Sequence, residues 1–200
     1  MTFQDWLIER SIDPAKAVCV TVGTDGLSTK KDNLLAVSLY SQDESRTIFV
    51  QGASPDKNME YTGISNERYR REAVLWKEAL SEIEAVLQNA SFGVMYNEAF
   101  TNRWMHHGFP LCVSWDDLPK VDVTKFFKLH SIMETLPKDV GTVRELAARM
   151  LITVATRGSL PAFATIAHDL LGDAHVDRTL LEMKPAQLYD VYQIMLMMDF

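Results

Sequence analysis

The sequence predicts an α/β fold in which a mixed five-stranded sheet is flanked by helices. Its first third holds three apolar runs with β-rich composition, whereas apolar residues recur at helical spacing along most of the remainder. The links between the first three runs are short, which predicts an antiparallel meander. Two later apolar runs follow helical segments, which predicts parallel strands beside the meander, with helices on the faces of the sheet.

The meander is expected to consist of strands at residues 17–23, 33–40 and 46–51. The first of these runs, A-V-C-V-T-V-G, ends at T-D-G in residues 24–26, which is a turn signal.

Residues 67–88 are expected to form one helix, because their apolar side chains recur at helical spacing. Six apolar residues fall on one face of this helix: Val74, Leu75, Leu80, Ile83, Val86 and Leu87. The opposite face carries mixed charges, which is typical of a solvated helix surface.

The remaining elements follow in the order strand, helix, strand and then helices. A fourth strand is expected at 91–95, parallel to the first, and a helix at 98–105. Residues 121–123 begin either a fifth strand or a helix, and the two adjacent histidines at 106–107 are expected in a loop. Further helices are expected at 142–154, 160–171, 176–182 and from Pro185 to about Met198.

Composition restricts the class of protein. The 200 residues are 47% hydrophobic and 24% charged, as in an ordinary globular domain, and one domain over residues 1–200 is expected. The longest segment without a charged residue, 85–97, has about 13 residues, fewer than the roughly 18 that a membrane helix needs. The N-terminus lacks the apolar core of a signal peptide. We therefore expect a cytoplasmic protein that does not bind membranes.

The net charge restricts the partners that the protein is expected to bind. The formal net charge is −7, whereas a dedicated nucleic-acid binder carries a basic face that neutralises phosphates. A protein partner or self-association is therefore expected, and any nucleic-acid binding is expected to be weak.

Cys19 and Cys112 lie in apolar runs without a C-x-x-C motif, which predicts buried core residues in a reducing compartment.

Several short motifs follow one another along the chain. T-V-G-T-D-G-L occupies residues 21–27, Y-T-G-I-S residues 61–65 and Y-N-E-A-F-T residues 96–101, and His168 and Asp173 lie within H-D-L-L-G-D-A. In this order, the motifs resemble those of the DEDDh (DnaQ-like) 3′–5′ exonucleases, which have a ribonuclease-H-like fold.

The resemblance covers roughly residues 15–185 and implies a set of cleft residues. Five residues match the family's segments D-x-E-T-T-G-L and H-N-x-x-F-D: Thr24, Gly26, Leu27, Asn97 and Phe100.

The family's reaction uses four carboxylates that hold two divalent ions, and a histidine that acts as general base. On this chain the first three carboxylate positions are Thr21, Gly23 and Thr101, so only Asp173 and the base His168 remain. A neutral hydroxyl is a weak ligand for hard Mg²⁺ or Mn²⁺, and glycine offers no side chain. The resemblance therefore implies a degenerate, catalytically inactive domain without a metal cofactor.

Such a pseudoenzyme would act as a protein-interaction or weak nucleic-acid-binding module, linked through its family to DNA replication or repair. An alternative stays open: Asp25, Glu98 or Asp122 beside Asp173 could hold Mg²⁺ or Mn²⁺ in a rearranged carboxylate site of an active 3′–5′ exonuclease. His168 can also be a helix histidine bonded to a backbone carbonyl, and Asp173 a helix cap.

Three further interpretations belong to other residues. Asn97 is expected to bond backbone groups at a strand end. The histidines at 106–107, with His168, Asp169 and Asp173, would suit an all-helical histidine–aspartate phosphohydrolase, which the β-rich first third argues against. Near the C-terminus, one helical face either packs on the chain's own sheet or forms a docking face or dimer seam. It holds Tyr189, Tyr192, Met195 and Leu196.

Overall fold

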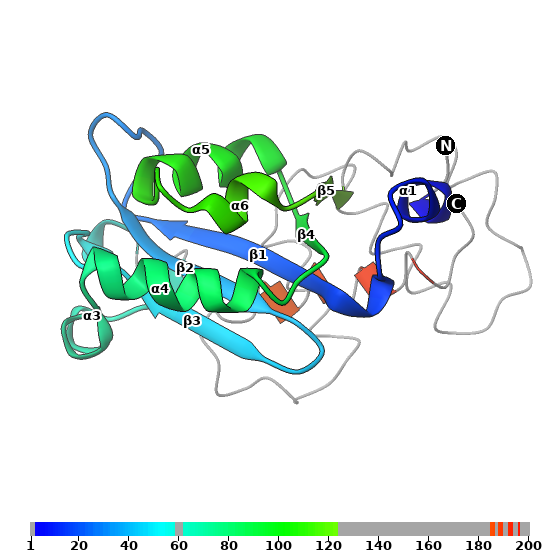
Figure 1. Cartoon of the computed structure of the whole chain (residues 1–200). Coiled ribbons are helices and arrows are strands. Elements are labelled where there is room, and N and C mark those ends of the chain that lie inside the picture. The colour runs from blue at the N-terminus through cyan, green and yellow to red at the C-terminus, as the bar shows by residue number, and fades with distance from the viewer. Residues whose placement is uncertain are drawn as a thin grey trace, which may run out of the picture.

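The computed structural model describes residues 3–58 and 62–123, together with residues 185, 186, 188, 189, 192, 193 and 196. Its centre is a five-stranded sheet in the order β3-β2-β1-β4-β5 (Figure 1). The strands are β1 (Ala17–Thr24), β2 (Leu34–Tyr40), β3 (Ser45–Phe49), β4 (Phe92–Met95) and β5 (Lys120–Asp122). β1, β2 and β3 pair in antiparallel fashion, whereas β4 runs parallel to β1 and β5 runs parallel to β4. The mixed sheet expected from the sequence is therefore confirmed.

β1 lies in the middle of the sheet and separates two apolar clusters. Its side chains alternate between the two faces. Val18 and Val20 belong to the cluster that also contains residues of α4 and α5. Ala17 and Cys19 belong to the cluster on the other face, with Phe92 of β4. Burial on both faces explains why β1 reads as a nearly continuous apolar run.

One face of the sheet is covered by three helices, α4 (Trp76–Leu87), α5 (Glu98–Gly108) and α6 (Val113–Asp117) (Figure 1). α1 (Phe3–Glu9) packs on the other face, near the start of β1. The sequence analysis did not anticipate α1 and α6.

Three short elements complete the described part of the chain. Two are 3₁₀ turns, η1 (Pro14–Lys16) and η2 (Pro55–Asn58), and the third is the helix α3 (Asn66–Glu72).

The expectation of one continuous helix over 67–88 is wrong, because α3 and α4 are separate. Val74 between them forms a parallel bridge with Val50 beyond β3. The Val74 N–H donates to the Phe49 carbonyl at 2.9 Å, and the Gln51 N–H donates to the Val74 carbonyl at 3.0 Å. Leu75, which was expected on the buried face, is 58% exposed because it occupies the N-cap of α4. The bridge protects part of the open edge of β3.

The structure also decides two expectations for single segments. Residues 120–122 form a strand, and the two histidines at 106–107 lie in the last turn of α5 rather than in a loop. The helices expected at 142–154, 160–171 and 176–182 lie outside the described residues.

Tyr192 connects the end of the chain to its beginning. Its ring meets Phe3 and Phe92 edge-on, with centroids 6.0 and 5.6 Å apart, and its hydroxyl donates to the Pro14 carbonyl at 2.5 Å. Tyr189 and Leu196 pack against the same cluster. For these residues, the interpretation that the C-terminal segment packs on the chain's own sheet is confirmed. Met195 lies outside the described residues.

Within the described part of the chain, every helix is too short or too polar to cross a membrane.

Candidate functional site

The candidate site is built around the end of β1, which carries Thr21 and Gly23, the positions expected to correspond to the family's first two carboxylates. Thr21 pairs with Ser38 of β2, and Gly23 pairs with Ala36. Because side chains alternate along a strand, Thr21 shares the face of Cys19, opposite the face covered by α4. The pairing shifts between Gly23 and Thr24, and this irregularity leads the chain into its turn.

Thr21 is buried. The residue is 7% exposed, and its hydroxyl has no hydrogen-bond partner within the described part of the chain. The neighbouring hydroxyls of Ser38 and Thr47 bond each other at 2.9 Å instead. Hydroxyl groups on β1, β2 and β3 therefore form a polar row across the sheet, and Thr21 is the member without a partner among the described residues.

Thr101, expected to correspond to the family's third carboxylate, lies on α5, which begins shortly after β4. Asn97 caps this helix in a left-handed conformation with φ 61°, and its side chain accepts the Phe100 N–H at 3.1 Å. The expectation that Asn97 bonds backbone groups is confirmed. Thr101 is 2% exposed, and its N–H donates to the Asn97 carbonyl at 3.1 Å.

Arg103 joins the two halves of the expected cleft. Its guanidinium lies over the Phe100 ring, 5.4 Å from the centroid, and donates to the Leu27 carbonyl at 3.5 Å. Leu27 itself is 74% exposed and projects from the turn after β1. The sequence analysis missed Arg103, although its position three residues after Phe100 places the two on one helix face.

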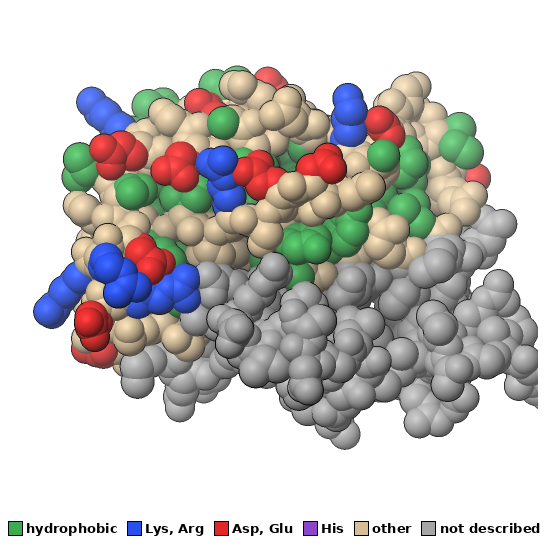
Figure 2. All heavy atoms as spheres, turned by 90° about the horizontal axis from the view of Figure 1, so that it is seen from below, with side chains coloured by type: hydrophobic (Ala, Val, Ile, Leu, Met, Phe, Trp, Pro, Cys, Tyr) green, Lys and Arg blue, Asp and Glu red, His purple; other side chains and the backbone are tan. Residues whose placement is uncertain are grey.

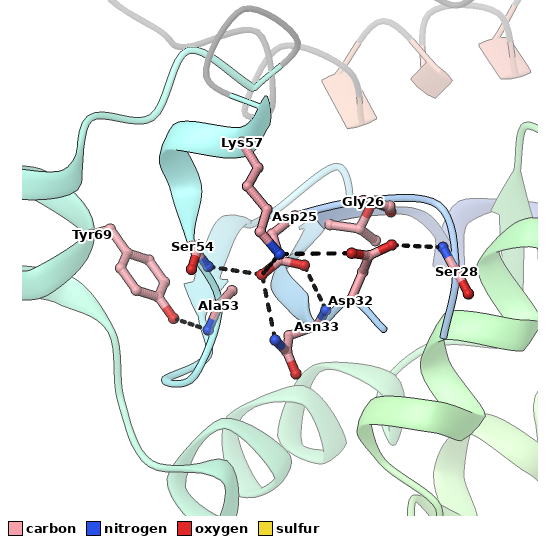
Figure 3. Close-up of polar contacts among 10 residues, drawn as sticks. Asp25, Gly26, Ser28, Asp32, Asn33, Ala53, Ser54, Lys57 and Tyr69 are labelled. Carbon is pink, nitrogen blue, oxygen red and sulfur yellow. Dashed lines mark hydrogen bonds and ion pairs between the residues drawn. The ribbon is translucent and has the colours of Figure 1, made fainter. Parts of the chain in front are cut away.

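Asp25 follows β1 and is saturated with donors (Figure 3). Its side chain is fully buried. The carboxylate accepts the Asn33 N–H at 2.6 Å, the Asn33 side-chain amide at 3.4 Å and the Ser54 N–H at 2.9 Å. The Lys57 ammonium lies 3.8 Å away. This carboxylate therefore holds the turn after β1 against the loop that follows β3.

Lys57 also lies 3.7 Å from a carboxylate oxygen of Asp32 (Figure 3). The other Asp32 oxygen accepts the Ser28 N–H at 3.0 Å. A Cβ on Gly26 would stand 2.2 Å from the Asp32 carboxyl carbon, so any other residue at this position would displace the Asp32 side chain. We call Asp25, Asp32, Asn33, Ser54 and Lys57 the turn clasp.

Tyr69 of α3 extends this network. Its hydroxyl donates to the Val50 carbonyl at 2.5 Å and accepts the Ala53 N–H at 2.9 Å. Burial raises the pKa of Tyr69, and the negative charge of Asp25 adds to the effect. The loop after β3 is thus held by α3 on one side and by the turn clasp on the other.

Asp122 and Glu98 occupy a different place. Cys19, Val94 and Val121 are in register across β1, β4 and β5, so Asp122, the next residue, faces the opposite side of the sheet from Thr21. There the Asp122 carboxylate accepts the Glu98 N–H at 2.9 Å, at the start of α5. A carboxylate is favourable at this position because unpaired N–H groups and the helix dipole meet there.

The described residues do not fit a pair of hard divalent ions. Such ions need several oxygen anions, but Thr21 and Thr101 offer neutral hydroxyls, Asp25 is saturated by N–H donors, and Asp122 faces away. Among the described residues, no three His, Cys, Asp or Glu side chains gather in one place. His168 and Asp173 lie outside the described residues.

The surface charge near this end of the sheet is mixed. Figure 2 shows Lys and Arg side chains gathered where α3 lies. Two of them are paired, because Arg68 and Arg71 lie 2.9 and 2.8 Å from the carboxylate of Glu72. The guanidinium groups of Arg71 and Arg68 lower the pKa of Glu72. This local positive charge is therefore partly neutralised.

An antiparallel β3-β2-β1 meander continued by parallel β4 and β5, with helices on the faces, is the exonuclease form of the ribonuclease-H-like fold. Among solved structures, the chain is similar to Escherichia coli exonuclease I. In the zinc-bound complex with single-stranded DNA, the TM-score is 0.52 at 12% identity, over 89% of this chain and 39% of that chain. In the complex with a dA16 oligonucleotide, the TM-score is 0.51 at 12% identity, over 89% of this chain and 41% of that chain.

At this identity, the likeness establishes the fold. The chain spans about two fifths of the length of the exonuclease I chains that it resembles. No protein-family model and no curated protein sequence matches it.

Proposed function

We propose that this chain is a catalytically inactive relative of the 3′–5′ exonucleases that acts as a protein-interaction or weak nucleic-acid-binding module. The observation that carries the proposal is the chemistry at the end of β1. The two positions that would carry the first metal ligands are Thr21 and Gly23, and the Thr21 hydroxyl is neutral and unpartnered among the described residues.

The neighbouring acids support the same conclusion. The Asp25 carboxylate already accepts hydrogen bonds from Asn33 and Ser54. The Asp122 carboxylate accepts the Glu98 N–H at the start of α5. Without metal charge, the transition state of phosphodiester hydrolysis loses several kcal/mol of stabilisation, which at about 1.4 kcal/mol per tenfold removes orders of magnitude in rate.

The partner follows from fold and charge. The exonuclease I structures with a similar fold are complexes with DNA, and a link to DNA replication or repair fits that likeness. The net charge of −7 disfavours tight phosphate binding, so a protein partner is the stronger candidate and single-stranded DNA the weaker one.

The test combines calorimetry and cleavage on the full chain. Mg²⁺ and Mn²⁺ are titrated up to about 10 mM, and 5′-labelled single-stranded DNA is incubated with the same ions. We expect neither metal binding nor cleavage. Fluorescence anisotropy with the same DNA should show weak binding that falls as salt is raised.

A matched pair of histidine variants separates true activity from contamination. Cleavage that is lost in His168→Ala but retained in His106→Ala, an exposed residue of α5, would overturn the proposal. Loss of metal binding in Asp25→Asn would identify the rearranged carboxylate site instead.

A further inference from the structure

A pocket lies at the opposite end of β1 from the candidate site. β1 pairs with β4 from Ala17 onwards, but with β2 only from Cys19 onwards. The first two residues of β1 therefore extend past the end of β2. There the chain turns back through residues 41–44, where the Ser41 N–H donates to the Glu44 carbonyl at 2.8 Å.

The last turn of α4 and the residues that follow it close this notch. The resulting pocket has a volume of about 340 Å³, at the lower end of the range for small-molecule sites. Its apolar lining includes residues of β1, of α4 and of the loop after α4: Ala17, Val18, Val86 and Ala90. Its polar lining includes Lys16, Ser41, Asp43, Glu44 and Asn89.

Among the described residues, two charges of opposite sign on this lining have no partner. Glu44 forms an ion pair with Arg46, so its charge is compensated. The Lys16 ammonium and the Asp43 carboxylate have neither a hydrogen bond nor an ion pair with any described residue, and they do not pair with each other. One comes from η1 and the other from the turn between β2 and β3.

We propose that this pocket binds a small zwitterion with an apolar body, of the free amino acid or dipeptide class. The ligand's carboxylate would pair with Lys16 and its ammonium with Asp43, while its apolar part would lie against Val18, Val86 and Ala90. Each ion pair would be a charge-assisted hydrogen bond beside apolar lining. This site is independent of the proposed loss of nuclease activity, because it lies at the other end of the sheet.

The probes are L-leucine and glycyl-leucine, titrated into the full chain and followed by NMR of the backbone amides. We expect saturable shifts centred on Ala17, Val18, Asn89 and Ala90. N-acetyl-leucine, which lacks the ammonium, and leucinamide, which lacks the carboxylate, should each bind about tenfold more weakly or worse.

Charge-removing variants assign the two ends of the ligand. Lys16→Met should weaken leucine binding and abolish the preference over leucinamide. Asp43→Asn should weaken leucine binding and abolish the preference for leucine over N-acetyl-leucine. Both residues are exposed, so the variants should fold normally. Lys77→Met, at an exposed position of α4 outside the pocket, should leave binding unchanged. Absence of saturable shifts up to about 10 mM ligand, or equal binding by all three variants, would overturn the proposal.

Discussion

The carboxylate of Asp25 accepts the backbone N–H of Ser54 at 2.9 Å, and 29 residues separate the two along the chain. The same carboxylate accepts the Asn33 N–H at 2.6 Å. One buried carboxylate therefore accepts two backbone N–H groups, one from the loop before β2 and one from the loop after β3. This relationship gives the acid a structural role, because it holds the two loops together.

Replacing Asp25 by Asn should destabilise the protein. An amide has one acceptor oxygen, and its NH₂ group would face N–H donors, so at least one buried donor loses its partner. The expected loss is about 1–3 kcal/mol in the free energy of unfolding, measured by urea denaturation. Asp117→Asn, at an exposed position of α6, should change it by less than about 0.5 kcal/mol. Equal effects of the two variants would refute the role of the turn clasp.

Gly26→Ala should also destabilise the protein, and the effect should depend on Asp32. The new Cβ would stand 2.2 Å from the Asp32 carboxyl carbon, so the side chain must move and release the Ser28 N–H. A loss of about 1–3 kcal/mol is expected. In an Asp32→Ala background the same substitution should cost less by about 1 kcal/mol. A double-mutant cycle without coupling would show that the clash is relieved in another way.

Thr21→Val should stabilise the protein. The substitution removes a buried hydroxyl for which the described residues supply no partner, and it keeps the shape of the side chain. A gain of about 1 kcal/mol is expected, since burying an unpaired hydroxyl costs roughly 1–3 kcal/mol. Thr47→Val is the matched control, because its hydroxyl bonds Ser38 at 2.9 Å and its removal should cost about 1 kcal/mol. A loss of stability in Thr21→Val would mean that its hydroxyl is satisfied in solution.

Tyr192 should make stability fall at alkaline pH. Burial raises the pKa of Tyr192 above its ordinary value of 10.0, and the neighbouring Tyr189 adds to the effect. Below pH 10.0 the phenol is protonated in both states. Above it the unfolded state ionises first, so the free energy of unfolding falls as the pH rises.

Tyr192→Phe tests this dependence. The variant loses the hydrogen bond to the Pro14 carbonyl, which should cost about 1 kcal/mol at pH 7. Its unfolding free energy should then decline less steeply than that of the wild type above pH 10.0. Denaturation curves at several alkaline pH values give both slopes, and parallel slopes would contradict the prediction.

The strands and the expected parallel pairing could be predicted because their signals are local. The run at 17–23 is apolar on both faces, and this alone indicates a central strand. The capping role of Asn97 was also predictable, since asparagine tolerates the left-handed conformation at a helix start. In both cases, neighbours in the sequence determine the structure.

The separation of α3 from α4 and the role of Asp25 could not be predicted in this way. The first depends on Val74 pairing with Val50, and the second on Ser54 approaching from beyond β3. Both are contacts between segments far apart in the chain. The helical periodicity over 67–88 gives no indication of the bridge. The predicted apolar face therefore extended beyond the start of α4 and wrongly included Leu75.

The register of β5 has a consequence for how a carboxylate metal site could be built at the end of β1. Asp122 faces away from Thr21, and no single substitution turns it around, because only an inserted or deleted residue changes which side of a strand a residue faces. Val121 is the β5 residue on Thr21's side of the sheet, but it is 1% exposed. An acid at that position would bury a charge among apolar side chains. A point mutation along β5 would therefore not supply a ligand on this side of the sheet, and an engineered site would have to use positions on β1 or α5.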